Sequence, residues 1–176
     1  LVAGWDCDTV RKLAPRAFCP VHSFAHSKDA TTDAEWSTAE VDFGERSTRF
    51  EVLRRGATWG VVETPLAGAF NVRNCLAAIA ACDAVGADKE GVIEGLRTFR
   101  SVRRRMEIRG KVGGVTVIDD FAHHPTAVSE TLAGVRQRYQ GRRVIAVFEP
   151  RSYTAQRREF QQPYVESLRA ADEVVL

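Results

Sequence analysis

The sequence contains no long run of apolar residues, so no segment offers the roughly 20 apolar residues that a membrane-spanning helix needs. A signal-peptide pattern is also missing from its first residues. The net charge at pH 7 is only +2, whereas nucleic-acid-binding proteins usually carry a strongly basic stripe. These absences predict a globular protein whose partners are neither a membrane nor a nucleic acid.

Cysteine is scarce, and none of the four cysteines lies at CxxC spacing from another. Zinc sites are usually built from such closely spaced pairs, so we expect no metal site of this kind. Cys75 and Cys82 fall in an alanine-rich segment, where small core residues are expected. Unpaired cysteines are typical of a reducing compartment, which predicts a cytoplasmic location.

Arginine is abundant, and charge is unevenly distributed along the chain. Residues 1–99 contain 11 Lys and Arg against 14 Asp and Glu, a net charge of −3, and residues 100–176 contain 14 against 9, a net charge of +5. Because guanidinium groups bind phosphate and carboxylate in a bidentate manner, this excess favours an anionic ligand near the second part. Residues 1–4 read as the end of a strand and 174–176 as the start of one, so we expect both ends to belong to a longer protein.

Short stretches rich in β-formers predict a meander of antiparallel strands in the first third of the chain. The expected strands are 21–24, 35–43, 48–53 and 58–63. An Ala- and Leu-rich segment then predicts a helix at 71–85, which Gly86 ends as the residue after its cap, and a second helix follows at 89–99. Asn71 and Asn74 lie three residues apart near the start of the first helix. Either one of them caps the helix, or both present amide groups outward.

A dense cationic run occupies 100–105. Such runs are most often solvated linkers between domains, and the functional alternative is an anion clamp at a domain junction. Further on, strands and helices alternate: 115–118 and 144–148 read as buried strands, and a helix is expected at 161–170. This alternation predicts an α/β fold with a mostly parallel sheet.

Polar side chains gather where the strand at 115–118 ends. Asp119 and Asp120 follow that strand, and His123 and His124 come just before the next predicted helix. Ligands bind outside the carboxyl ends of strands in open α/β sheets, so this turn is a candidate site. The structural alternative is a polar turn that caps the helix and leaves its imidazoles solvated.

Three separated stretches resemble the Mur ligases, the ATP-dependent amide ligases of peptidoglycan metabolism. They read GAFNVRNCLAAIAA at 68–81, RRRMEIRGKVGGVTVIDDFAHHPTA at 103–127 and FEPRSYT at 148–154. The double Asp with the double His resembles the branch that acts on UDP-N-acetylmuramate. Phe70 and the Glu-Pro-Arg-Ser run are most similar to the murein peptide ligases. The likeness covers residues 65–176.

This resemblance implies a complete enzyme of three domains: a UDP-binding domain, a central ATPase domain and a Rossmann-like C-terminal domain. Residues 1–101 would be the C-terminal part of the central domain, with short antiparallel strands plus helices. Residues 102–176 would be the front part of the C-terminal domain. The chain has no G-x-x-x-x-G-K-[ST] P-loop and no UDP-binding domain, so we expect no turnover by this chain alone.

The reaction implied by the resemblance begins when the γ-phosphate of ATP passes to the lactyl carboxylate of UDP-N-acetylmuramate. The amine of a murein tripeptide, L-alanyl-γ-D-glutamyl-meso-diaminopimelate, then attacks the acyl phosphate, and phosphate leaves. This reaction belongs to peptidoglycan recycling. Mg²⁺ and cationic side chains would position the phosphates and neutralise their charge.

The resemblance also assigns the nucleotide contacts. Asn74 matches the Asn that contacts adenine, whose donor–acceptor edge suits an amide. Asn71 matches an accompanying Asn whose role is left open. Arg105 matches the Arg that reaches the ATP phosphates, and Asp120 matches the Asp that binds the ribose hydroxyls.

The second substrate is assigned to the turn and to the stretch after residue 148. His123 and His124 lie near its expected place, where one of them would position the substrate or the metal shell. Arg151 and Tyr153 are the candidates for lining the peptide site.

Relatives that add a single L-alanine carry extra Arg where Ser152 and Ala155 stand here, which favours a larger peptide as substrate. The nearest alternative is a UDP-N-acetylmuramate–L-alanine ligase. A further alternative is a non-catalytic nucleotide- or metal-binding module, with the two Asp and two His of the turn around one ion. The last is an inactive folded fragment.

Overall fold

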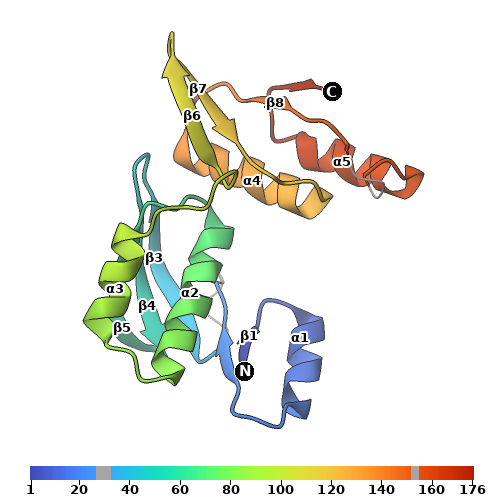
Figure 1. Cartoon of the computed structure of the whole chain (residues 1–176). Helices are drawn as coiled ribbons and strands as arrows, with labels where there is room; N and C mark the ends of the chain where they lie inside the picture. The colour runs from blue at the N-terminus through green and yellow to red at the C-terminus, as the bar shows by residue number, and fades with distance from the viewer. Residues whose placement is uncertain (27–32, 152–154) are drawn as a thin grey trace. The chain divides into compact units, whose positions relative to one another are not determined.

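In the computed structural model the chain forms two compact units, Leu1–Phe99 and Arg100–Leu176 (Figure 1). The structure describes residues 1–26, 33–151 and 155–176. Each unit combines helices and strands around its own core, as expected for an α/β protein. Among the described residues, no helix combines the length and apolar character that crossing a membrane requires.

The first unit contains a five-stranded sheet with the order β1-β2-β3-β4-β5. Its strands are β1 (Val2–Gly4), β2 (His22–Phe24), β3 (Trp36–Phe43), β4 (Thr48–Arg54) and β5 (Ala57–Thr64). The predicted antiparallel meander is confirmed for β3, β4 and β5, but β2 pairs in parallel with both β1 and β3. The connection from β1 to β2 runs through α1 (Asp8–Leu13) and η1 (Ala14–Arg16), which gives the crossover that the parallel pairing of these two strands needs.

Two helices complete this unit: α2 (Ala69–Ala84), which contacts β1, β2 and β3, and α3 (Lys89–Thr98), which contacts β5 (Figure 1). The fully buried side chains come from the sheet and from one face of α2. The largest are Trp36, Phe50, Val52, Val62, Leu76 and Ile79. Each contributes about 1.5–3 kcal/mol through removal of its apolar surface from water, so this core holds the amino end of α2 in a fixed place.

Gly86 ends α2 as predicted. Its φ of 75° lies in the left-handed region that glycine adopts without a Cβ penalty. The Gly86 N–H donates to Asp83 O at 2.9 Å and the Ala87 N–H to Cys82 O at 3.0 Å, which is the Schellman pattern. Asp88 then caps α3, because its Oδ2 accepts from the Gly91 N–H at 2.8 Å.

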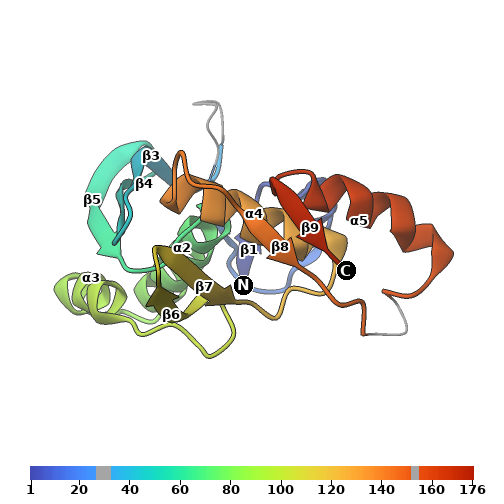
Figure 2. The ribbon, with the colours of Figure 1, turned by 90° about the horizontal axis from the view of Figure 1, so that it is seen from above.

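The second unit begins with a hairpin of β6 (Glu107–Val112) and β7 (Val115–Asp119). Gly113 and Gly114 both have positive φ, which a two-residue turn of this kind requires. The remaining elements are α4 (Pro125–Arg138), β8 (Ile145–Val147), η2 (Arg158–Phe160), α5 (Gln161–Leu168) and β9 (Glu173–Val175). Helices α4 and α5 pack together around Leu132, Tyr164 and Leu168, and β8 pairs in parallel with β9 (Figure 2).

The strands of this unit differ from the expectation in two ways. Strands β7 and β8 were predicted to be buried, yet Val115 is 62% exposed on β7 and Val147 is 80% exposed on β8. The described strands also form two separate pairs, one antiparallel and one parallel, rather than one mostly parallel sheet. A run of β-branched residues does not distinguish a strand covered on both faces from one covered on a single face.

Candidate functional site

Asn71 and Asn74 lie in the first turns of α2, and neither caps the helix. The cap is Gly68, whose φ of 90° suits glycine, so the capping interpretation is wrong. The Asn71 Nδ2 instead donates to Ala67 O at 2.8 Å, and the Asn74 Nδ2 donates to Asn71 Oδ1 at 3.2 Å. This chain of hydrogen bonds fixes the amide of Asn74, which is exposed, with its carbonyl oxygen left as an acceptor.

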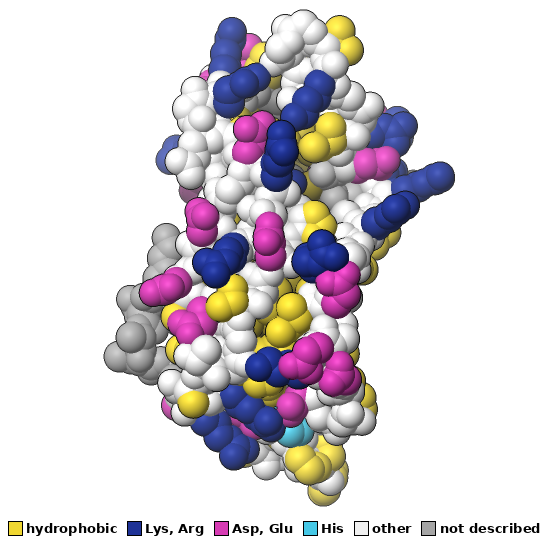
Figure 3. Space-filling model, turned by 90° about the vertical axis from the view of Figure 1, so that its left-hand side faces the viewer, with side chains coloured by type: hydrophobic (Ala, Val, Ile, Leu, Met, Phe, Trp, Pro, Cys, Tyr) yellow, Lys and Arg dark blue, Asp and Glu magenta, His cyan; other side chains and the backbone are white. Residues whose placement is uncertain are grey.

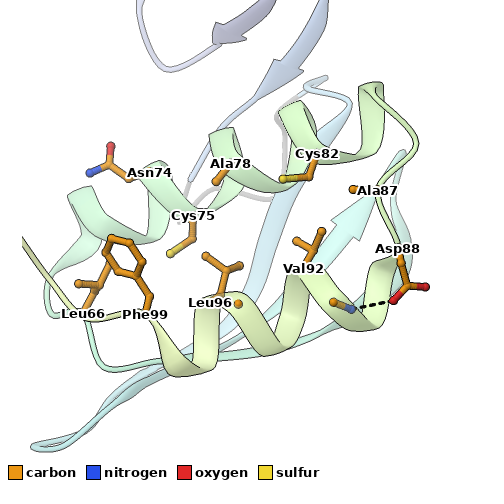
Figure 4. A pocket seen from close by; sticks show the side chains of 12 residues that line it. Leu66, Asn74, Cys75, Ala78, Cys82, Ala87, Asp88, Val92, Leu96 and Phe99 are labelled. Atoms are coloured by element: carbon orange, nitrogen blue, oxygen red, sulfur yellow. Dashed lines mark hydrogen bonds between the residues drawn. The ribbon is translucent and has the colours of Figure 1, made fainter.

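A cavity of about 540 Å³, which was not predicted from the sequence, lies between α2 and α3. Cys75, Val92 and Leu96 point into it, whereas the amide of Asn74 points away from it at its rim (Figure 4). Burial raises the pKa of the Cys75 thiol to about 11, although a hydrogen bond with Thr64 lowers it in part. The cavity is therefore an apolar space lined by a neutral thiol.

The cationic run ends in an unusual turn around Arg105. Its neighbours Arg104 and Met106 have φ values of 57° and 49°, in the left-handed region that side chains other than glycine rarely adopt. Each such residue costs about 1–3 kcal/mol and persists only where its surroundings impose it. Arg105 is exposed, and no ion pair joins it to any described residue. The turn therefore presents one unpaired guanidinium.

Arg104 is held back against the end of β7. Its Nε lies 3.6 Å from Asp119 Oδ2, and its guanidinium lies over the Phe121 ring at 4.9 Å from the centroid. The Phe121 N–H also donates to Arg104 O at 2.8 Å. Of these two adjacent arginines, Arg104 has a carboxylate and a ring as neighbours, and Arg105 forms no ion pair with a described residue. Lys and Arg side chains also gather over the upper part of the face shown in Figure 3, which belongs to the second unit.

Asp120 uses both carboxylate oxygens on the backbone. Its Oδ2 accepts from the Met106 N–H at 2.8 Å and its Oδ1 from the Ala122 N–H at 2.8 Å. It thereby joins the turn of Arg105 to the end of β7. A carboxylate has about four lone-pair sites, so two remain for hydroxyl groups such as those of a ribose.

The two imidazoles have different hydrogen-bond partners and therefore different tautomers. His123 Nδ1 lies 3.0 Å from Phe121 O, and because a carbonyl only accepts, this nitrogen carries the proton. His124 Nδ1 accepts from the Thr126 N–H at 3.3 Å, so it caps α4 and carries none. In neutral form His123 then presents a free lone pair at Nε2, and His124 presents an Nε2–H donor.

The strand-following residues after β8 are described only in part. Arg151 is exposed and pairs with Glu149 at 2.8 Å, and Tyr153 lies outside the described residues. Ala155 is buried between α4 and α5, among Leu132, Tyr164 and their neighbours.

In the second unit, the structure joins the turn of Arg105 to Asp120 through the Met106 N–H, and His123 and His124 follow Asp120 along the chain. Asn71 and Asn74 lie in the first unit. Among the described residues, no group of three or more His, Cys, Asp or Glu is arranged to hold a metal ion. The two Asp and two His of the turn form no such group.

Two family models match the chain. The model of the Mur ligase middle domain matches residues 1–82, and that of the Mur ligase, glutamate ligase domain matches residues 104–176. The expected fold, a Mur ligase middle domain followed by a C-terminal domain, is confirmed. The chain belongs to the Mur ligase family, whose members are ATP-dependent ligases.

The curated relatives are longer proteins. A UDP-N-acetylmuramate–L-alanine ligase of Nostoc punctiforme is 38% identical over all of this chain and 35% of its own length. That of Salinibacter ruber is 45% identical over 74% of this chain and 27% of its own length. The chain therefore spans about a quarter to a third of the length of these relatives.

Solved structures of the family also match. The UDP-N-acetylmuramate–alanine ligase of Thermotoga maritima superposes with a TM-score of 0.73 at 25% identity, over 86% of this chain and 33% of its own. A murein peptide ligase from Psychrobacter arcticus superposes with a TM-score of 0.61 at 31% identity, over 93% of this chain and 34% of its own.

Proposed function

We propose that this chain is part of a cytoplasmic, ATP-dependent ligase that joins an amine to UDP-N-acetylmuramate through an acyl phosphate. Residues 1–101 would be the C-terminal part of its central ATPase domain and residues 102–176 the front of its C-terminal domain. The observation that carries the proposal is the turn at the start of the second unit, where an unpaired Arg105 stands beside the anchored carboxylate of Asp120.

The residues suit a nucleotide with separate tasks. Arg105 would neutralise the phosphates of ATP, where charge develops during transfer of the γ-phosphate. Asp120 would accept from the ribose hydroxyls with its remaining lone pairs. Asn74, held by Asn71, would pair with the adenine edge.

Mg²⁺ would neutralise phosphate charge when it is bound, but no described cluster of this chain fits it. We therefore assign the ion no ligand here. His123 and His124 would orient the incoming amine substrate, one as an acceptor and the other as a donor.

Two amine substrates have specific support. The names of the curated relatives favour L-alanine, because the Nostoc punctiforme ligase matches the whole chain at 38% identity. The murein tripeptide is favoured by Ala155, which is buried and offers no guanidinium where the resemblance places one in the alanine-adding enzymes. Arg151 is exposed and would contact the peptide.

The test is a substrate panel with the complete ligase, which includes the UDP-binding and P-loop segments. Phosphate release from ATP is measured in the presence of Mg²⁺, UDP-N-acetylmuramate and either L-alanine or the tripeptide. The amine that gives the faster phosphate release is the substrate. If neither L-alanine nor the tripeptide gives phosphate release, the proposal is contradicted.

The nucleotide contacts are tested with Asn74→Ala, Arg105→Ala and Asp120→Ala, each of which should weaken ATP binding measured by calorimetry. Arg97→Ala is the matched control, because Arg97 is an exposed arginine on α3 whose ion-pair partner is Glu94. Wild-type affinity in all three variants would overturn these assignments.

A further inference from the structure

The turn that carries Arg105 is closed by carboxylates on both sides. Glu107 Oε2 accepts from the Arg104 N–H at 2.9 Å, and Asp120 Oδ2 accepts from the Met106 N–H at 2.8 Å. Arg104 and Met106, whose N–H groups make these bonds, are the two residues with left-handed φ that flank Arg105. Each unfavourable backbone conformation is thus held by a charge-assisted hydrogen bond.

The carbonyl groups of the turn are also occupied. Arg104 O accepts from the Phe121 N–H at 2.8 Å, and Arg105 O accepts from Ser101 Oγ at 3.2 Å. Glu107 is paired with Asp119 in the β6–β7 register, and Asp120 follows Asp119 directly. The carboxylates of Glu107 and Asp120 therefore come from facing ends of one hairpin. The hairpin therefore supplies hydrogen bonds to the backbone on both sides of Arg105, whose side chain is exposed.

We propose that Glu107 is a positioning residue for Arg105. Together with Asp120, Glu107 holds the 104–106 turn in the form that presents the guanidinium of Arg105 to the phosphates of a substrate. The inference rests on the proposed function, because it takes ATP as the ligand of Arg105. The Arg104 N–H is the main reason that the pKa of Glu107 lies below its ordinary value, so its carboxylate is charged in the folded unit at neutral pH.

A purely structural role for Glu107 is the competing explanation, since its Oε1 also accepts from Arg109 Nη1 at 3.0 Å. Two substitutions separate these contacts. Glu107→Ala removes both of them, whereas Arg109→Ala breaks the ion pair and leaves the hydrogen bond from the Arg104 N–H in place. Glu107→Gln keeps a side-chain oxygen that can accept from this N–H.

The first experiment measures kcat and KM for ATP in the complete ligase. Glu107→Ala should raise the KM for ATP about tenfold, the effect of losing one hydrogen bond to a charged group. Glu107→Gln should stay within about threefold of wild type, since a neutral acceptor is weaker but present. Arg109→Ala should match the wild type.

A double-mutant cycle then asks whether Glu107 acts through Arg105. In the Arg105→Ala background, Glu107→Ala should cause no further rise in KM, because the group that it positions has gone. Equal effects of Glu107→Ala in both backgrounds would overturn the proposal, and so would a wild-type KM in the single variant.

Amide hydrogen exchange gives a second readout that does not depend on catalysis. In the complete ligase, Glu107→Ala should speed exchange at the amides of Arg104 and Met106 and leave the amides of α4 unchanged. Unchanged exchange at 104 and 106 would show that Glu107 does not hold the 104–106 turn. If the wild type lacked ligase activity, the proposed function would fail, and the exchange rates would still show whether Glu107 holds this turn.

Discussion

Replacing glycine by alanine at two positions around the α2–α3 connection should change stability in opposite directions. Gly95 lies in the exposed interior of α3, where a Cβ would meet nothing within 4 Å. Gly86 follows α2, where a Cβ would also meet nothing within 4 Å, but its φ is 75°. Because space is available at both positions, only the backbone conformation distinguishes them.

The magnitudes follow from helix propensity and from the left-handed penalty. Gly95→Ala should stabilise the first unit by about 1 kcal/mol, since glycine is that much less favourable than alanine in a helix interior. Gly86→Ala should destabilise it by about 1 kcal/mol or more, because alanine pays the left-handed cost at the Schellman position. For a unit of this size, each change corresponds to a shift of roughly 4–8 °C in Tm.

Tryptophan fluorescence is the suitable assay, because all three tryptophans, Trp5, Trp36 and Trp59, lie in the first unit. Thermal unfolding followed by this signal should show a higher Tm for Gly95→Ala and a lower one for Gly86→Ala. Two shifts of the same sign would refute the assignment of the opposite effects to the backbone conformation of each glycine.

Three further predictions test the thiols, one buried carboxylate and one buried hydroxyl. In native protein, Cys7 and Cys19 should react with iodoacetamide and Cys75 should not, because it is buried and its pKa is raised to about 11; mass spectrometry that finds Cys75 labelled first contradicts this. Burial opposes the charge of Glu35, but a hydrogen-bonded imidazole and two guanidinium groups outweigh it and lower its pKa, so its contribution to stability is present above its ordinary value of 4.5 and is lost as pH falls through the lower folded value. Denaturant unfolding followed by tryptophan fluorescence should therefore show Glu35→Gln less stable than wild type at pH 7, with a gap that closes toward pH 3; a constant gap would be inconsistent with this linkage. Tyr164→Phe should lower the stability of the second unit by about 1 kcal/mol, since the hydroxyl donates to His123 O at 2.5 Å. Calorimetry should detect this loss, and the unfolding of the first unit followed by tryptophan fluorescence should be unchanged.

Local signals in the sequence predicted most of the first unit. The helices near 71–85 and 89–99 and the stop at Gly86 follow from periodicity and from a glycine whose conformation the turn requires. The parallel pairing of β2 was not predictable from such signals, because it depends on which distant strand lies beside it. The exposure of β7 and β8 depends on what covers each sheet face, and the residue pattern of a strand does not contain this information.

The candidate site shows a similar limit. Arg105 and Asp120 could be named from motifs, but the left-handed turn between Arg104 and Met106 has no marker in the sequence, because arginine and methionine are not residues that favour positive φ. The proposed role of Glu107 also depends on the β6–β7 register, which brings it opposite Asp119. Residue identity therefore indicated the chemistry, and the hairpin determined how that chemistry is presented.

The double use of Asp120 bears on how any variant at this position is interpreted. Its carboxylate holds the Met106 N–H and the Ala122 N–H, and the proposed function also gives it the ribose hydroxyls. Two lone-pair sites remain for those hydroxyls, so the two tasks are compatible in one side chain. Asp120→Ala removes both tasks together, and a loss of ATP affinity in that variant is not evidence for ribose binding alone. Glu107→Ala removes a different hydrogen bond of the same turn and keeps the carboxylate of Asp120, so it measures what loosening the turn costs while the proposed ribose contact stays possible.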